Sequence, residues 1–413
     1  MSTTTSTEKA RTVVTGIGLC APNGLGPTAY WKNTLRGQSG IGPITRFDTS
    51  KYWSKIAGEV PGFEPAEHLQ GRLLPQTDHM TRLALVATDW ALWGAGLRST
   101  DVPEYDMAVV TAATAGGYEF GQREMQKLWQ QGPDFVSAYQ SFAWFYAVNT
   151  GQISIRHGMR GPGAVLVTEQ AGGLDAVGHA RRQLRKGVRM ALTGGIDSSL
   201  CPWAWVAHQV SGSLSRSNDA RKAYLPFDED ANGYVTGEGG AIFVLETADS
   251  AAQRYPVRVY GEIAGYAATF DSRVPGREPG LRRAAELALA DAGMSTKDID
   301  VVFADAAGTP ELDKAEAEAI NGLFGPHGVP VTAPKTMTGR LFAGGASLDL
   351  ASALLSVWDG VIPPTVNIRH PNKDYELDLV LDDPRHQRVR AALVLARGRG
   401  GYNSAIVVCE YNR

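Results

Sequence analysis

The chain has 413 residues, of which 43% are hydrophobic and 20% charged, and its formal net charge is -3. Such a composition is typical of a soluble globular protein, and the length allows two domains or one duplicated domain. The near-neutral charge argues against a nucleic-acid-binding or membrane-surface protein, and no apolar run approaches membrane-spanning length. The three cysteines lie far apart, which favours a reducing, cytoplasmic compartment and gives no metal-ligand spacing.

Alternating apolar runs and turn residues predict an α/β fold with mostly buried sheets. A polar tail at 1–10 lacks the apolar core of a signal peptide. Residues 138–155 are dense in aromatic side chains. The other elements expected in chain order are strands at 11–20, 107–111 and 188–192, helices at 81–97 and 116–131, and a glycine turn at Gly194–Gly195.

The most informative segment runs from Gly163 to Gly187. Its β-branched run at 164–168 predicts a buried strand, which is followed by a tight turn and an amphipathic helix. Enzymes use such a strand–turn–helix unit to expose a nucleophile, because the free N–H groups of the helix start stabilise negative charge. The residue at the turn here is Gln170, whose amide does not ionise and can only donate and accept hydrogen bonds.

A repeated pattern suggests an internal duplication. Gly172–Gly187 and Gly344–Gly360 both begin with Gly-Gly, continue with Leu-Asp, and run into a helical pattern that ends near a glycine. We therefore expect two similar halves, near 11–250 and 256–413.

Four sequence blocks resemble those of β-ketoacyl synthases, occur in the order of that family and span nearly the whole chain. They are Arg11–Gly26, Pro226–Glu246, Ala333–Gly345 and Arg397–Ala405. The resemblance implies a thiolase-like, five-layered αβαβα fold built from two pseudo-duplicated halves, working as a dimer.

The departures from the family pattern fall on its reactive groups. Gln170 replaces the cysteine, while Ala307 and Arg340 replace the two histidines. Lys335 is kept, and Arg399 replaces the phenylalanine of a Gly-Phe-Gly-Gly turn. A self-sufficient condensing enzyme needs a covalent acyl carrier and polarised decarboxylation, and the matched positions provide neither.

Residues 141–162 and 169–182 look very like the chain length factor, which is the ketosynthase β-subunit of bacterial type II aromatic polyketide synthases. That subfamily pairs with an active ketosynthase α-subunit, works with an acyl carrier protein that carries malonyl and the growing chain, and helps form the polyketide tunnel. The resemblance therefore implies a non-condensing, heterodimeric subunit that controls chain length in aromatic polyketide biosynthesis. The sequence contains no Walker loop, dinucleotide fingerprint or metal constellation, so we expect no cofactor.

Residues that match the end of the family's tunnel are Tyr118, Gly121 and Met125, with Trp203 at another wall position. The spacing of the first three places them on one helix face. A glycine and a flexible methionine leave the cavity deep, so a long product, a decaketide or longer, is expected. The alternative is an ordinary packing stripe.

Gln170 itself has two interpretations. Its amide assists malonyl decarboxylation by hydrogen-bonding the developing enolate, or it only fills the space left by the cysteine. Lys335 and Arg340 are expected to fill the old cavity and to hydrogen-bond Gln170 or Glu169.

The sequence leaves alternatives open for two further segments and for the function as a whole. The aromatic run 142–146 lies at a subunit interface or in the core, and the basic residues from Arg181 to Arg189 form a solvated helix end or a carrier-protein contact. The alternatives to a chain length factor are a scaffold homodimer and a self-sufficient synthase that uses Cys20, Cys201 or Cys409.

Overall fold

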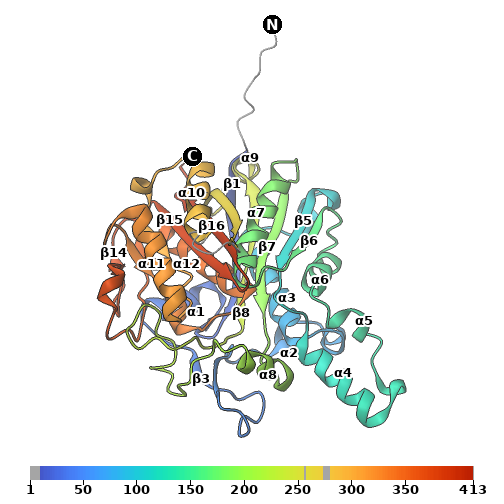
Figure 1. Ribbon diagram of the computed structural model, residues 1–413. Helices are drawn as coiled ribbons and strands as arrows, with labels where there is room; N and C mark the ends of the chain where they lie inside the picture. Colours follow the sequence, from blue (N-terminus) through green and yellow to red (C-terminus); the bar gives the residue numbers. More distant parts are fainter. Residues whose placement is uncertain (1–9, 255–256, 273–279, 413) are drawn as a thin grey trace.

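The computed structural model describes residues 10–254, 257–272 and 280–412 (Figure 1). Its centre is a 12-stranded sheet in the order β13-β11-β10-β15-β16-β9-β1-β8-β7-β5-β6, with β2 paired to β1. The strands from the first half of the chain are β1 (Thr12–Ala21), β2 (Gly24–Leu25), β5 (Met107–Ala112), β6 (Gly163–Leu166), β7 (Met190–Asp197) and β8 (Gly239–Thr247). Those from the second half are β9 (Gly261–Phe270), β10 (Val301–Phe303), β11 (Pro330–Thr332), β13 (Asp378–Leu379), β15 (Ala391–Gly398) and β16 (Tyr402–Cys409).

The helices cover the faces of this sheet, and two small sheets lie beside it. The helices are α1 (Gly26–Leu35), α2 (Pro65–His68), α3 (His79–Gly94), α4 (Tyr118–Gln131), α5 (Gln140–Ala143), α6 (Val148–His157), α7 (Gly172–Leu184), α8 (Pro202–Val210), α9 (Ala248–Gln253), α10 (Gly280–Ala292), α11 (Pro310–Phe324) and α12 (Ala343–Asp359). The small sheets pair β3 (Ile41–Pro43) with β4 (Ile56–Gly58) and β12 (Val361–Ile362) with β14 (Arg385–His386). Among the described residues, no helix combines the length and apolar character needed to span a membrane.

The two halves of the sheet have the same topology. In the first, β8 lies antiparallel between β1 and β7, and β5 lies parallel between β7 and β6. In the second, β16 lies antiparallel between β9 and β15, and β10 lies parallel between β15 and β11. A short antiparallel pairing of β1 with β9 joins the halves. The expected duplication is therefore present in the fold, while the boundaries at 11–250 and 256–413 stay a prediction.

Five layers result from this arrangement. Helices α7 and α12 pack between the two half-sheets, α3 covers the outer face of the first, and α10 covers the outer face of the second. The three largest clusters of buried apolar residues accordingly are one central and two outer ones, and two smaller clusters are separate from them. Strands such as β7 and β15 are buried along their whole length, which explains why they read as continuous apolar runs rather than alternating ones. The layered αβαβα fold expected from the sequence is confirmed.

Gly173, in the first of the repeated Gly-Gly pairs, allows the two central helices to touch. A β-carbon at Gly173 on α7 would lie 2.6 Å from the carbonyl oxygen of Ala343 and 2.5 Å from Ser347 Oγ on α12. No ordinary side-chain carbon approaches a backbone oxygen so closely, so this contact requires glycine.

Two local predictions are wrong. Gly194–Gly195 lies inside β7 rather than in a turn, because the missing side chain lets β8 pass: a β-carbon at Gly194 would lie 2.1 Å from the carbonyl oxygen of Ala241. The strand β6 is not buried, since within the described ranges it forms the edge of the sheet and pairs with β5 alone, and its residues are half-buried or exposed. An apolar run does not distinguish an edge strand from a central one.

Candidate functional site

Gln170 lies in a single 3-10 turn, η5 (Glu169–Ala171), between β6 and α7. Its side chain is fully buried, and its backbone N–H donates to Glu169 Oε2 at 2.9 Å. Glu169 adopts a positive φ of 52°, a conformation that non-glycine residues seldom take and that marks strained turns at functional sites. The strand–turn–helix unit predicted from the sequence is present, with Gln170 at its turn.

The amide of Gln170 is enclosed by the start of α12. A β-carbon at Gly345 would lie 2.6 Å from Gln170 Nε2 and 2.7 Å from Gln170 Oε1, so the amide packs against the glycine backbone. Neither of these two polar atoms has a hydrogen-bond partner within the described part of the chain. A buried amide without partners is unfavourable, typically by about 1–3 kcal/mol relative to a satisfied one.

The expected hydrogen bonds from Lys335 and Arg340 to Gln170 or Glu169 are absent among the described residues, and that prediction is wrong. Lys335 Nζ donates to the carbonyl oxygens of Ala304 and Asp305 at 2.8 and 2.9 Å, and forms an ion pair with Asp349 at 2.7 Å.

Arg340 is held by a different carboxylate. It donates to both carboxylate oxygens of Asp305 at 3.1 and 3.2 Å and to the carbonyl oxygen of Arg397 at 3.2 Å. Both cations are buried, and a buried cation is stable only when a carboxylate or carbonyl satisfies it.

Asp305 is the centre of this charged cluster. Burial alone would raise the pKa of its carboxyl, but Arg340, Arg397 and Lys335 outweigh burial and hold the pKa below its usual value. For Asp349, burial dominates over the attraction of Lys335 and raises the pKa to about 6. The cluster therefore serves to pair charges within the fold and contains neither a thiol nor an imidazole.

Most of the positions at which this chain departs from the family's catalytic pattern line one cavity of about 250 Å³. Ala307, Arg340 and Arg399 line it together with Glu169, whose Oε2 accepts the backbone N–H of Arg399 at 3.0 Å. Gln170 does not line this cavity, since its amide packs against Gly345 on α12. Three of the four degenerate positions named from the sequence thus face one space; the fourth, Lys335, is buried beside it.

The remaining cysteines are poor nucleophiles. Burial raises the pKa of Cys201 and of Cys409 to about 11, and raises the pKa of Cys20 further. Since only the thiolate attacks acyl groups, these values argue against a synthase that uses one of the three.

A second cavity, of about 630 Å³, lies between α4 and α8. Tyr118, Gly121, Met125 and Trp203 all line it, so the structure brings the four gate residues named from the sequence together. The ring centroids of Tyr118 and Trp203 are 5.1 Å apart. A β-carbon at Gly121 would lie 3.4 Å from Trp144 Cβ, in ordinary contact, so the glycine leaves open space rather than avoiding a clash.

Aromatic side chains are exposed around the mouth of this second cavity. The run at 142–146 is divided: Trp144, Phe145 and Tyr146 are exposed, Trp144 by 49%, whereas Ala143 is buried and Phe142 packs against the core. The large exposed apolar residues on α4, α5, α8 and the loops between them are Met125, Trp129, Phe135, Tyr139, Trp144, Phe145, Tyr146, Trp203, Val206 and Val210. Exposed apolar surface of this extent is typical of a protein–protein interface.

The basic helix end differs from expectation at one position. Arg181 is buried, forms an ion pair with Asp291 and donates to the carbonyl oxygen of Ala264. It therefore ties α7 to the second half of the fold. Arg182, Lys186 and Arg189 are exposed, as expected for the end of a helix.

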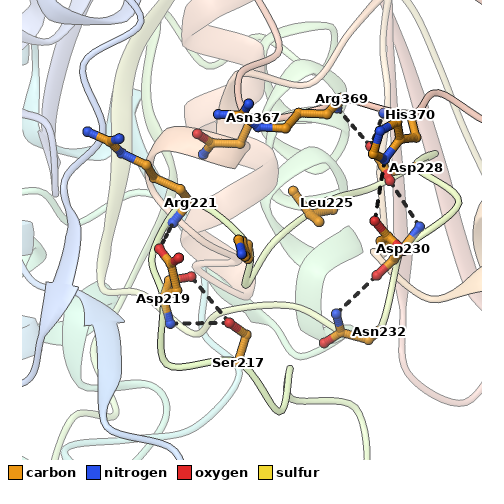
Figure 2. Close-up of a pocket in the computed structure, with 11 residues that line it drawn as sticks. Ser217, Asp219, Arg221, Leu225, Asp228, Asp230, Asn232, Asn367, Arg369 and His370 are labelled. Atoms are coloured by element: carbon orange, nitrogen blue, oxygen red, sulfur yellow. Dashed lines mark hydrogen bonds and ion pairs between the residues drawn. The ribbon is translucent and has the colours of Figure 1, made fainter.

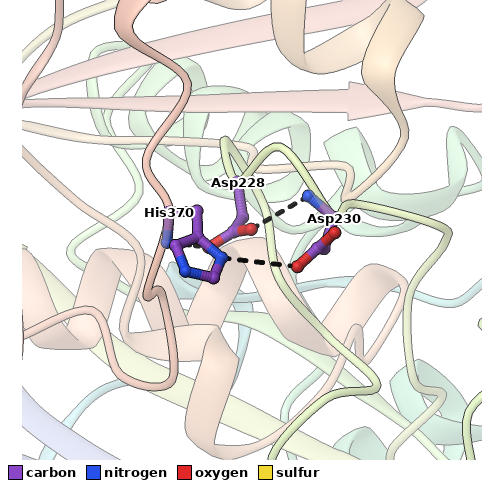
Figure 3. A group of neighbouring side chains, drawn as sticks. All are labelled: Asp228, Asp230 and His370. Carbon is purple, nitrogen blue, oxygen red and sulfur yellow. Dashed lines mark hydrogen bonds and ion pairs between the residues drawn. The ribbon is translucent and has the colours of Figure 1, made fainter.

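A third and more polar cavity, of about 790 Å³, lies on the surface near Arg221 and Arg369 (Figure 2). In its wall, Asp228, Asp230 and His370 each place one possible ligand atom within 4.8 Å of the others (Figure 3). Asp228 Oδ2 already accepts the backbone N–H groups of Arg369 and His370 at 2.9 Å, and Oδ1 accepts that of Asp230 at 2.9 Å. These contacts give Asp228 a structural role in joining two loops.

Comparison with known proteins places this architecture in a family. The family model for the N-terminal domain of β-ketoacyl synthases matches residues 9–251, and the model for the C-terminal domain matches residues 260–369. The chain belongs to the β-ketoacyl synthase family.

Similar proteins show to which group within the β-ketoacyl synthase family the chain belongs. The chain is 62% identical over 401 residues to the tetracenomycin polyketide synthase ketoacyl synthase beta subunit of Streptomyces glaucescens, covering 97% of this chain and 98% of the relative. It is 57% identical over 400 residues to the actinorhodin polyketide putative beta-ketoacyl synthase 2 of Streptomyces coelicolor, with coverage of 97% and 98%. The structure of the ishigamide ketosynthase/chain length factor superposes with a TM-score of 0.90 at 30% identity, covering 98% of this chain and 100% of that one. Within the family, the chain therefore groups with the ketosynthase β-subunits, or chain length factors, of type II polyketide synthases, as the sequence resemblance predicted.

Proposed function

We propose that this protein is the non-condensing partner of an active ketosynthase α-subunit, and that it limits the length of the poly-β-ketone chain made by the pair. The observation that carries the proposal is the apolar cavity between α4 and α8, which opens on a face rich in exposed aromatic residues. A partner docked on that face would bury these side chains and close the cavity into a tunnel.

The degenerate site supports a non-condensing role. At the positions of the cysteine and the two histidines stand a buried amide, a methyl group and a guanidinium that is paired with Asp305. None of these groups forms an acyl thioester or exchanges a proton near neutral pH. The α-subunit would supply that chemistry, and an acyl carrier protein would deliver malonyl units and hold the growing chain. One similar solved structure is that of a type II PKS acyl-carrier protein in complex with its ketosynthase bound to the hexaketide. The matching chain in that structure has a TM-score of 0.86 at 25% identity, covering 98% of this chain and 100% of that one.

Chain length would be set by the available space. The growing chain crosses the interface and extends along the wall formed by Tyr118, Gly121 and Met125 until Trp203 and its neighbours stop it. Gly121 contributes no side chain, so the cavity is deep and a decaketide or longer product fits the proposal.

The geometry favours a space-filling role for Gln170 over decarboxylation. Its amide is fully buried against Gly345 and does not line the cavity that Glu169 and Arg340 share. A malonyl thioester would have to displace this packing before the amide could reach it.

The test is co-expression with and without an α-subunit that retains the cysteine and both histidines. We expect a stable 1:1 heterodimer that converts malonyl-carrier protein into a polyketide, and no acyl extension by this chain alone. Extension of an acyl thioester by the isolated chain, or failure of the two chains to associate, would overturn the proposal.

A further inference from the structure

The start of α8 is held by a side chain from α4. Gln122 Oε1 accepts the backbone N–H of Trp203 at 2.7 Å. The N–H groups in the first turn of a helix have no partner within the helix, and the N-cap residue Cys201 provides no side-chain hydrogen bond. Gln122 therefore caps α8 from a neighbouring helix, across 81 residues of sequence.

This hydrogen bond joins two residues in the wall of the second cavity. Gln122 follows Gly121 on α4, whereas Trp203 projects from the first turn of α8, and all three residues line the same space. Because the bond is made by the backbone N–H of Trp203, it holds the backbone position from which the indole projects, whichever rotamer the side chain adopts. The Tyr118 and Trp203 rings also touch across the cavity, but each of these residues is partly exposed and Trp203 is 53% exposed.

The first turn of α4 is anchored independently of Gln122. Asp78 Oδ2 accepts the backbone N–H of Phe120 at 2.8 Å. Arg46 bridges Glu119 on α4 to the buried Glu238, which it contacts at 2.6 Å. Loss of the Gln122 hydrogen bond would therefore leave α4 in place and remove one constraint on Trp203, while the buried Trp205, whose indole N–H donates to the carbonyl oxygen of Ser54 at 2.9 Å, still holds the body of α8.

We infer that Gln122 is a positioning residue for chain-length control: by capping α8 it holds the Trp203 indole at a fixed separation from the α4 wall. The inference rests on the proposed function. Without the tether, Trp203 samples positions closer to and farther from Gly121, so the tunnel has no single depth and products of several lengths result. A neutral hydrogen bond of typical net strength biases such an equilibrium by about fivefold.

The experiment uses the reconstituted heterodimer with malonyl-carrier protein and measures the product length distribution by mass spectrometry. Gln122→Met keeps the length of the side chain but removes the acceptor, and we expect the share of off-length products to rise by about fivefold. Gln122→Glu keeps an acceptor and should retain the wild-type distribution. Gln131→Met is the matched control, since it makes the same substitution at the exposed end of α4, outside the cavity.

Two further variants separate the possible failures. If Gly121→Phe shortens the product while Gln122→Met leaves the distribution unchanged, the inference is wrong and the proposed function stands. If Gly121→Phe also has no effect, it is the proposed function that fails. Should Gln122→Met not assemble, Gln122→Asn replaces it, because the asparagine amide is too short to reach Trp203. Identical distributions for the asparagine and glutamate variants would then overturn the inference.

Discussion

Arg340 and Asp305 form a two-point ion pair at a position where the resembled family carries a catalytic histidine. The two nitrogen–oxygen distances are 3.1 and 3.2 Å, and both side chains are buried. The guanidinium therefore fills the vacated space and neutralises a carboxylate that the fold keeps in its interior. The fold therefore needs Arg340 for stability, and the guanidinium of Arg340 cannot perform the chemistry of a catalytic histidine.

This relationship predicts that Arg340→Ala destabilises the protein. Removing the cation leaves Asp305 buried with Arg397 and Lys335 as the remaining cations beside it in the described part of the chain, and such a loss typically costs about 3 kcal/mol. Urea unfolding of the heterodimer measures the effect. The control is Arg399→Ala, which removes an exposed guanidinium from the same cavity and should change the free energy of unfolding by less than about 0.5 kcal/mol. Equal effects of the two variants would contradict the structural role of the ion pair.

The gathering of Ala307, Arg340 and Arg399 around one space could be predicted because their sequence blocks match a family whose active site is known to combine them. The pairing of Arg340 with Asp305 could not be predicted, because nothing in the local sequence indicates which carboxylate will pair with a buried cation. The prediction that it binds Gln170 or Glu169 failed for this reason.

The capping of α8 by Gln122 was missed on similar grounds. Gln122 accepts a hydrogen bond from a backbone N–H, a group that does not depend on the type of side chain, so no residue pattern marks the contact. The edge position of β6 was missed because strand order is a property of the whole sheet. The shared helix face of Tyr118, Gly121 and Met125, in contrast, follows from local periodicity, and the three residues line one cavity; their role as a chain-length gate stays a prediction.

Glu238 predicts a specific acid sensitivity. Burial alone would raise the pKa of its carboxyl, but His79 and Arg46 outweigh burial and lower the pKa to about 2. The unfolded-state pKa is higher, at about 4.3, so the stabilisation is complete above that pH and is lost as the pH falls toward the folded-state pKa.

Glu238→Gln should therefore flatten the decline of unfolding free energy between about pH 5 and pH 2, by about 3 kcal/mol over that window. Chemical unfolding at a series of pH values measures the slope. Glu229→Gln, at an exposed position, serves as the control and should leave the slope unchanged. A wild-type slope in Glu238→Gln would show that the carboxyl contributes no pH-dependent stability.

The enclosed amide of Gln170 predicts a stabilising substitution. Gln170→Met has nearly the same shape and removes two buried polar atoms that have no partner among the described residues, so we expect a gain of about 1 kcal/mol. Thermal unfolding of the heterodimer measures it. In the same preparation, the rate of malonyl-carrier protein decarboxylation should remain at the wild-type level. A tenfold fall in that rate, with the heterodimer intact, would instead assign Gln170 to decarboxylation.

The central claim is that the shape of the cavity beside α4 determines how long the polyketide grows. A phenylalanine at Gly121 fits the backbone, because its β-carbon would lie 3.4 Å from Trp144 Cβ and 3.8 Å from Trp203 Cζ3. Its ring would extend into the open space and shorten the tunnel. The mass of the polyketide released by the Gly121→Phe heterodimer is the most direct test: the account predicts a product shorter by at least one two-carbon unit, whereas the wild-type mass at an equal yield of heterodimer would contradict it.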